Sequence, residues 1–213
     1  MEGLAASGQA ETDLGIAVQP PPETVGVFEA AGGVGQPEAT PSRGAVNTTI
    51  GEINYAVSGG SEREVLESLR AGGPKSEGSA FFGLTVTELE YRYYKVTENG
   101  ACRIEDVVVD LNVEITLPEW SGSRAADAEL RSAWSRFSTA LRRHENMHRD
   151  LAVQGAEGVR EALEGLRTRS CATADEEAQQ AAERVRIETE AAHRDFDHQT
   201  EHGRTQGAVW PQP

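Results

Sequence analysis

Hydrophobic and polar positions alternate through much of the middle of the chain, and this period of two predicts β-strands. The expected strands cover residues 49–57, 81–96 and 102–117. In the last of them, the odd-numbered positions from Val109 to Leu117 are hydrophobic and the even-numbered positions between them are polar. The pattern predicts an antiparallel sheet with one hydrophobic face that needs a cover, and Pro118 is expected to end the last strand.

After Pro118 the period lengthens to between three and four residues, which predicts helices. A long helix is expected to begin near Arg124, with Ser123 as its N-cap, and a second helix is expected over residues 174–196. The core-facing positions of the first helix are Trp134, Phe137, Leu141, His144, His148 and Leu151. Those of the second helix are mostly small, so the two helices can pack closely as an antiparallel αα-hairpin on the sheet. Glycines at 155, 158 and 165 predict a bend or a break late in the first helix.

The ends of the chain lack these periods and set the domain boundaries. Residues 1–46 show no sustained pattern and are interrupted by proline and glycine, which predicts a disordered or weakly ordered leader. The folded domain is expected over residues 47–209, followed by a tail over 210–213. We therefore expect one α+β domain, in which a long helix and a second, antiparallel helix cover an antiparallel sheet.

Charge and cysteine content narrow the class of protein. A net charge of −15 argues against nucleic-acid binding, and no hydrophobic run is long enough for a transmembrane segment. The two cysteines, Cys102 and Cys171, predict one structural disulfide and thus an oxidising, secreted or periplasmic location. The alternative is a cytosolic protein in which the two cysteines are buried free thiols. No secretory signal peptide is visible at the N-terminus, as a secreted protein would be expected to carry.

The candidate chemistry lies in the long helix, where residues 144–148 form the pentapeptide HExxH. His144 and His148 are one helical turn apart, so both imidazoles can reach one metal ion. Glu145 lies about 100° around the helix from His144. Zn²⁺ lowers the pKa of a water that it binds, and Glu145 could accept the proton as general base. The alternative is a pair of packed histidines, and chance produces the pentapeptide on the order of once in a hundred such chains.

A catalytic zinc site needs a third protein ligand and an open position. The antiparallel hairpin returns the end of the second helix toward HExxH, where acidic and imidazole side chains gather between residues 193 and 202. His202 is the first choice as third ligand, and Asp197 is the second.

Several short blocks together resemble one known family. They lie at residues 55–59, 73–74, 100–102, 117–120, 134–137 and 144–148, at Cys171, and at residues 196–203 and 206–208. Over roughly residues 52 to 209, the chain is similar to a bacterial family of predicted secreted zinc-dependent proteases, classed as a domain of unknown function. A tyrosine is more usual in that family where Phe196 stands.

The resemblance implies zincin-like peptidase chemistry. It implies that His144, His148 and His202 are zinc ligands and that Glu145 is the catalytic base. It also implies that Asp197 and Thr200 lie behind the ligands and orient an imidazole.

We therefore expect a zinc-dependent peptidase that hydrolyses a peptide or protein substrate. Two other functions remain open. One is a non-catalytic secreted binding module with a structural or vestigial zinc site, and the other is a zinc amidohydrolase that acts on a non-peptide amide.

Overall fold

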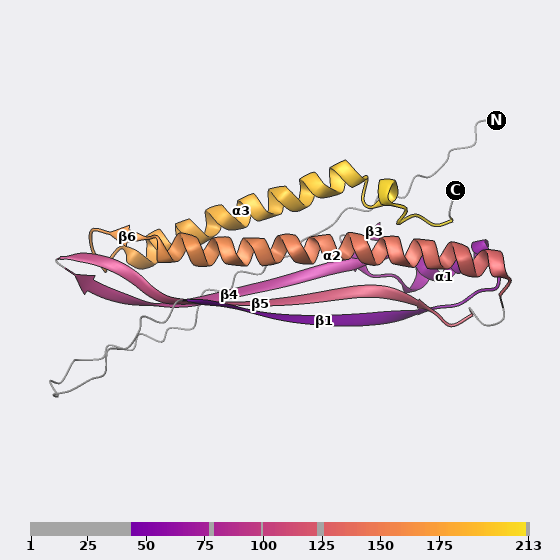
Figure 1. Cartoon of the computed structure of the whole chain (residues 1–213), viewed down its shortest axis with the longest axis horizontal. Coiled ribbons are helices and arrows are strands. Elements are labelled where there is room, and N and C mark those ends of the chain that lie inside the picture. The colour runs from indigo at the N-terminus through magenta and orange to yellow at the C-terminus, as the bar shows by residue number, and fades with distance from the viewer. Residues whose placement is uncertain (1–43, 77–78, 99, 123–125, 212–213) are drawn as a thin grey trace.

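The computed structural model describes residues 44–76, 79–98, 100–122 and 126–211. Most of the expected leader and the expected N-cap Ser123 lie outside these residues. The described part is an α+β arrangement in three layers: a sheet, a long helix along one face of it, and a second helix over the first (Figure 1). The main elements are β1 (Ala45–Val57), β4 (Leu84–Glu98), β5 (Ala101–Trp120), α2 (Ala128–Glu164) and α3 (Ala174–Thr200).

The sheet is mixed, and the expectation of an antiparallel sheet was wrong. β5 lies in the middle, with β4 antiparallel on one side and β1 parallel on the other. The short β6 (Arg167–Thr168) pairs with the first residues of β5. Alternating polarity is the same in parallel and antiparallel strands, so the sequence pattern carried no information on direction. The segment between β1 and β4, which includes helix α1, allows the crossover that parallel pairing needs.

The hydrophobic positions of β5 lie in the core, as the sequence predicts. Its odd-numbered residues from Val107 to Leu117 are all 4% exposed or less. The strand continues past Pro118 to Trp120 because β4 begins opposite Thr116. On that side β5 is an edge strand at Pro118, and a missing N–H costs little there.

A short helix and a hairpin with strands of two residues each connect β1 to β4. Helix α1 (Glu62–Gly72) begins after Ser61, whose side chain accepts a hydrogen bond from the Glu64 amide. Gly73 follows the helix, and β2 (Lys75–Ser76) then pairs with β3 (Ser79–Ala80). This segment leads the chain to the start of β4, beside the candidate site.

Helix α2 runs for 37 residues without the expected break at Gly155 or Gly158, and it ends at Glu164, directly before Gly165. Its N-cap is Asp127, whose carboxylate accepts from the Leu130 amide at 2.7 Å. Gly155 lies within the helix and faces α3 closely, because a Cβ atom there would lie 2.5 Å from Thr189 Oγ1. In the described part of the chain, no helix is both long and hydrophobic enough to cross a membrane.

Both ends of α3 are fixed to the rest of the molecule. The disulfide between Cys102 and Cys171 joins the start of β5 to the segment before α3, and this prediction is confirmed. At the other end, the chain after α3 folds back over α2. There Trp210 is 4% exposed and donates a hydrogen bond to the Glu62 carbonyl, so the domain extends to this residue.

Candidate metal centre

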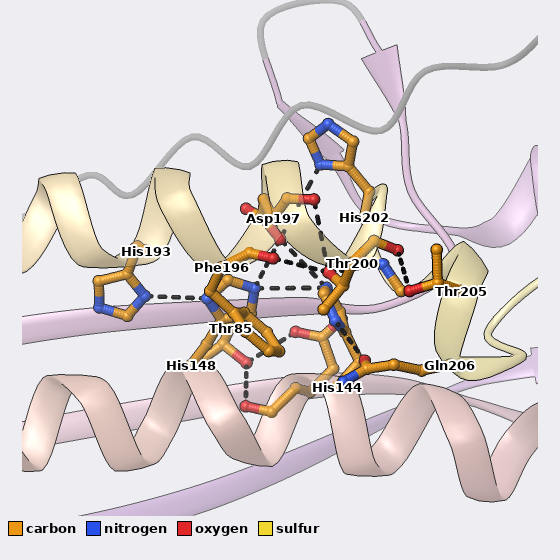
Figure 2. A network of polar contacts seen from close by, with 12 residues as sticks. Thr85, His144, His148, His193, Phe196, Asp197, Thr200, His202, Thr205 and Gln206 are labelled. Carbon is orange, nitrogen blue, oxygen red and sulfur yellow. Dashed lines mark hydrogen bonds and ion pairs between the residues drawn. The ribbon is translucent and has the colours of Figure 1, made fainter.

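Helices α2 and α3 bring three potential metal ligands together in the interior. His144 and His148 project from the buried face of α2, and Asp197 projects from the last turn of α3. The exposed fractions of the three residues are 5%, 0% and 4%. Figure 2 shows the two imidazoles and the carboxylate converging between the helices. The residues His144, His148 and Asp197 could hold a metal ion, and we call them the buried triad.

The separations within the buried triad match those between ligands of one small metal ion. Asp197 Oδ1 lies 3.2 Å from His144 Nε2 and 3.1 Å from His148 Nε2. The two Nε2 atoms are 3.4 Å apart. Tetrahedral ligands at about 2.0–2.1 Å from zinc are about 3.3 Å from one another. The three atoms therefore have the spacing of one face of such a tetrahedron.

The remaining ring nitrogens have acceptors that favour metal binding through Nε2. His144 Nδ1 lies 3.1 Å from Gln206 Oε1, and His148 Nδ1 lies 2.9 Å from His193 Nδ1. A proton on each Nδ1 atom leaves a lone pair on each Nε2 atom, which is the tautomer that a metal ligand needs. Two such lone pairs beside the Asp197 carboxylate repel one another unless a cation or protons lie between them.

The charge states of the imidazoles agree with this arrangement. Burial, and to a lesser degree His148, lowers the pKa of His193 to about 4, so His193 is neutral at pH 7 and can accept. Burial alone would lower the pKa of His144, but Asp197 and Glu145 outweigh it and raise the pKa above its ordinary value. Protons and a metal ion therefore compete for the same Nε2 atoms.

Glu145 lies beside the buried triad and is itself buried. It is 4% exposed, and its Oε2 accepts a hydrogen bond from Thr85 Oγ1 at 2.8 Å. A Cβ atom at Gly83 would lie 2.7 Å from Glu145 Oε1, so the carboxylate approaches the chain before β4 closely. Burial raises the pKa of Glu145, and the neighbouring imidazoles offset this only in part. A carboxyl group in such surroundings suits proton transfer near neutral pH.

A left-handed turn after α3 shapes the far side of the site. Glu201, His202 and Gly203 all have positive φ angles, of 49°, 53° and 80°. Two consecutive non-glycine residues in this region are costly and often mark functional sites. At Gly203 a Cβ atom would also lie 3.1 Å from His144 Cγ, so the turn passes directly over this imidazole.

The turn sets the positions of His202 and Thr200 beside the buried triad. His202 Nδ1 lies 3.9 Å from Asp197 Oδ1, and His202 is not among the three residues whose ligand atoms converge. The role of His202 as a ligand stays a prediction. Thr200 Oγ1 donates to the Phe196 carbonyl and accepts from the Gly203 amide at 3.2 Å. Both hydrogen bonds join the Thr200 side chain to backbone atoms, so Thr200 stabilises the turn.

Phe196 packs against the imidazoles of His144 and His148. Its ring stacks on His144 at 5.0 Å between centroids and meets His148 edge-on at 5.1 Å. Such contacts fix ring orientation without a hydrogen bond. The aromatic ring, which a tyrosine would share, is the part of this residue that the site uses.

Three residues around the site were not among the predicted site residues. His193 precedes Asp197 by four positions, so the helical period already placed both on one face of α3. Gln206 lies in the block shared with the resembled family. Thr85 carries no signal, because its role depends on how β4 lies over α2.

The fold and the site define a class of protein: an α+β protein in which two histidines of a buried HExxH helix meet an aspartate from a neighbouring helix. The chain belongs to the bacterial family described as Bacterial protein of unknown function (DUF922), which matches residues 53–203. The matched range contains the buried triad and Glu145. Comparison with curated proteins and with solved structures returns no match in either case.

Proposed function

We propose that the protein is a zinc-dependent peptidase with a zincin-like active site. His144, His148 and Asp197 hold the metal, and Glu145 is the general base. The observation that carries the proposal is the convergence of two Nε2 atoms and one carboxylate oxygen within 3.1–3.4 Å, next to a buried carboxyl group. The disulfide is compatible with the secreted or periplasmic location that goes with this function.

The side chains have separate tasks in this proposal. Zinc, when bound, supplies Lewis-acid polarisation of the scissile carbonyl and activation of a water molecule. Glu145 accepts a proton from the attacking water and delivers it to the leaving amine. Thr85 holds one carboxylate oxygen of Glu145, while Gln206 and His193 fix the tautomers of the two histidines.

The burial of the site favours a second candidate function. The three residues of the buried triad are between 0% and 5% exposed, and Glu145 is 4% exposed. A structural metal ion would cross-link the end of α3 to α2 and would need no access for substrate. In that case Glu145 would have no task in turnover.

One substitution separates the two functions. Glu145→Gln keeps the size of the side chain and removes its basicity, so the zinc-loaded variant should retain one equivalent of metal. If the protein is a peptidase, the variant should lose about 10²- to 10⁴-fold in turnover. The assay is cleavage of a diverse peptide library by mass spectrometry, with zinc content measured on the same samples.

The matched control is Glu157→Gln, an exposed glutamate later on α2, which should cleave like the wild type. No cleavage by the wild type with one equivalent of zinc bound would contradict the peptidase proposal. Equal cleavage by the wild type and Glu145→Gln would contradict the role of Glu145.

A further inference from the structure

A cavity of about 230 Å³ lies between β4, α2 and α3. Its wall is mainly hydrophobic and includes Leu89, Leu111, Ala152, Val159 and Ala182. The charged members of the wall, Glu183 and Arg186, form an ion pair with each other. The cavity therefore suits an uncharged, hydrophobic occupant.

Small residues on both helices create this space. Ala152 and Ala182 occupy core-facing positions that larger side chains fill elsewhere on α2, for example Phe137 and Leu163. At the same level, the contact of Gly155 with Thr189 keeps the two helices close together. Protein interiors are normally filled to the density of organic crystals, so an unfilled hydrophobic space of this size forgoes many contacts.

The cavity begins one helical turn from the ligand His148 on α2, and on α3 one turn from His193 and two turns from the ligand Asp197. Ala152 follows His148 by four residues on α2, and Thr189 precedes His193 by four residues on α3. On β4, Thr87 in the wall lies two residues after Thr85, the partner of Glu145. Figure 2 shows His193 on the side of His148 away from His144, the direction in which α2 continues to Ala152. One helical turn is about 5.4 Å, within reach of a side chain.

We propose that this cavity is the subsite for a large, uncharged hydrophobic side chain of the substrate, beside the bond that is cleaved. A hydrophobic cavity of about 150 Å³ holds benzene, so the space here accommodates an aromatic ring with part of its linker. The inference rests on the proposed function, because the metal centre defines where the scissile carbonyl lies.

Hydroxamates test the inference without a known substrate, because they occupy an open coordination position of a catalytic metal. Affinities for the zinc-loaded protein are measured for acetohydroxamate and for hydroxamates with a phenyl group on one to four methylenes. The best phenylalkyl compound should bind about 10- to 100-fold tighter than acetohydroxamate, which is the gain expected from burying the ring.

Cavity-filling variants test whether the gain in affinity comes from binding in the cavity. Ala182→Leu should remove it and leave the affinity for acetohydroxamate unchanged, and Val159→Phe is the second filling variant if the first does not fold. Gln180→Leu adds the same side chain to the exposed face of α3 and should keep the gain.

The outcomes distinguish failure of the proposed subsite from failure of the proposed function. Equal binding of all hydroxamates, or a gain that persists in both filling variants, overturns the subsite and leaves the metal centre intact. No binding of any hydroxamate to protein with one equivalent of zinc overturns the open coordination position, and with it both proposals.

Discussion

At the scale of single residues, the site depends on which side chain supplies the third ligand atom. Asp197 Oδ1 lies within 3.2 Å of both α2 imidazoles, whereas His202 Nδ1 is 3.9 Å from that oxygen. We expect Asp197→Ala to weaken zinc binding by more than about 100-fold and His202→Ala by at most about tenfold. Competition with a chromophoric chelator measures both affinities. The reverse order would restore His202 as the third ligand.

Thr85 provides a second prediction at this scale. Thr85→Val keeps the shape of a fully buried side chain and removes the hydroxyl that donates to Glu145. Leaving a buried carboxyl group without this donor should lower the free energy of unfolding by about 1–3 kcal/mol. Urea denaturation at pH 7 measures the change. Thr87→Val, two residues along the same face of β4, is the matched control, and an equal loss there would contradict the role of Thr85.

The residues of the site were only partly predictable from the sequence. HExxH identified His144, Glu145 and His148 as candidates, because their placement relative to one another depends only on helical spacing. The choice between Asp197 and His202 depends on the turn after Thr200, where two consecutive non-glycine residues take positive φ angles. Since L-residues seldom adopt that conformation, spacing alone could not show that Asp197 is the residue that converges with the two histidines.

At the scale of elements, the packing of α2 against α3 depends on a glycine that helix propensity alone would exclude. Gly155→Ala should favour the helix by about 1 kcal/mol, but its Cβ atom would lie 2.5 Å from Thr189 Oγ1. We expect the crowding to dominate and the variant to lose about 1–2 kcal/mol of unfolding free energy in thermal melts.

Two companion variants test the cause of that loss. Thr189→Ala in the Gly155→Ala background should recover most of it, because the crowded side chain is removed. Gly158→Ala, whose Cβ atom would lie 3.0 Å from Val185 Cγ1, should cost less than Gly155→Ala. A gain in stability from Gly155→Ala alone would contradict close packing at this position.

The elements themselves were largely predictable, whereas their arrangement was not. The pattern predicted the long strand β5 and the helices α2 and α3, because each depends on local periodicity. The direction of β1 and the continuity of α2 through Gly155 depend on contacts between distant segments. Polarity patterns do not encode those contacts.

At the scale of the whole molecule, α3 is fixed at its start by the disulfide and at its end by the buried triad. The disulfide closes a sequence separation of 69 residues. Replacing Cys102 and Cys171 together by alanine should lower the free energy of unfolding by about 4 kcal/mol. Chemical denaturation measures it, with the reduced wild type as control.

The same variant tests whether the two ends of α3 act independently. Zinc affinity of the folded double variant should stay within about twofold of the wild type, since effects at distant sites are usually additive. A loss of zinc binding in protein that remains folded would show that the disulfide positions the metal centre.

Anomalous diffraction at the zinc edge from crystals of the zinc-loaded protein tests the central claim most directly. We predict one strong peak, about 2.0–2.2 Å from His144 Nε2, His148 Nε2 and Asp197 Oδ1, with the fourth position open to solvent or substrate. A peak held by four protein ligands, with His202 among them, would contradict a catalytic centre. A peak elsewhere in the protein would contradict the buried triad as the metal site.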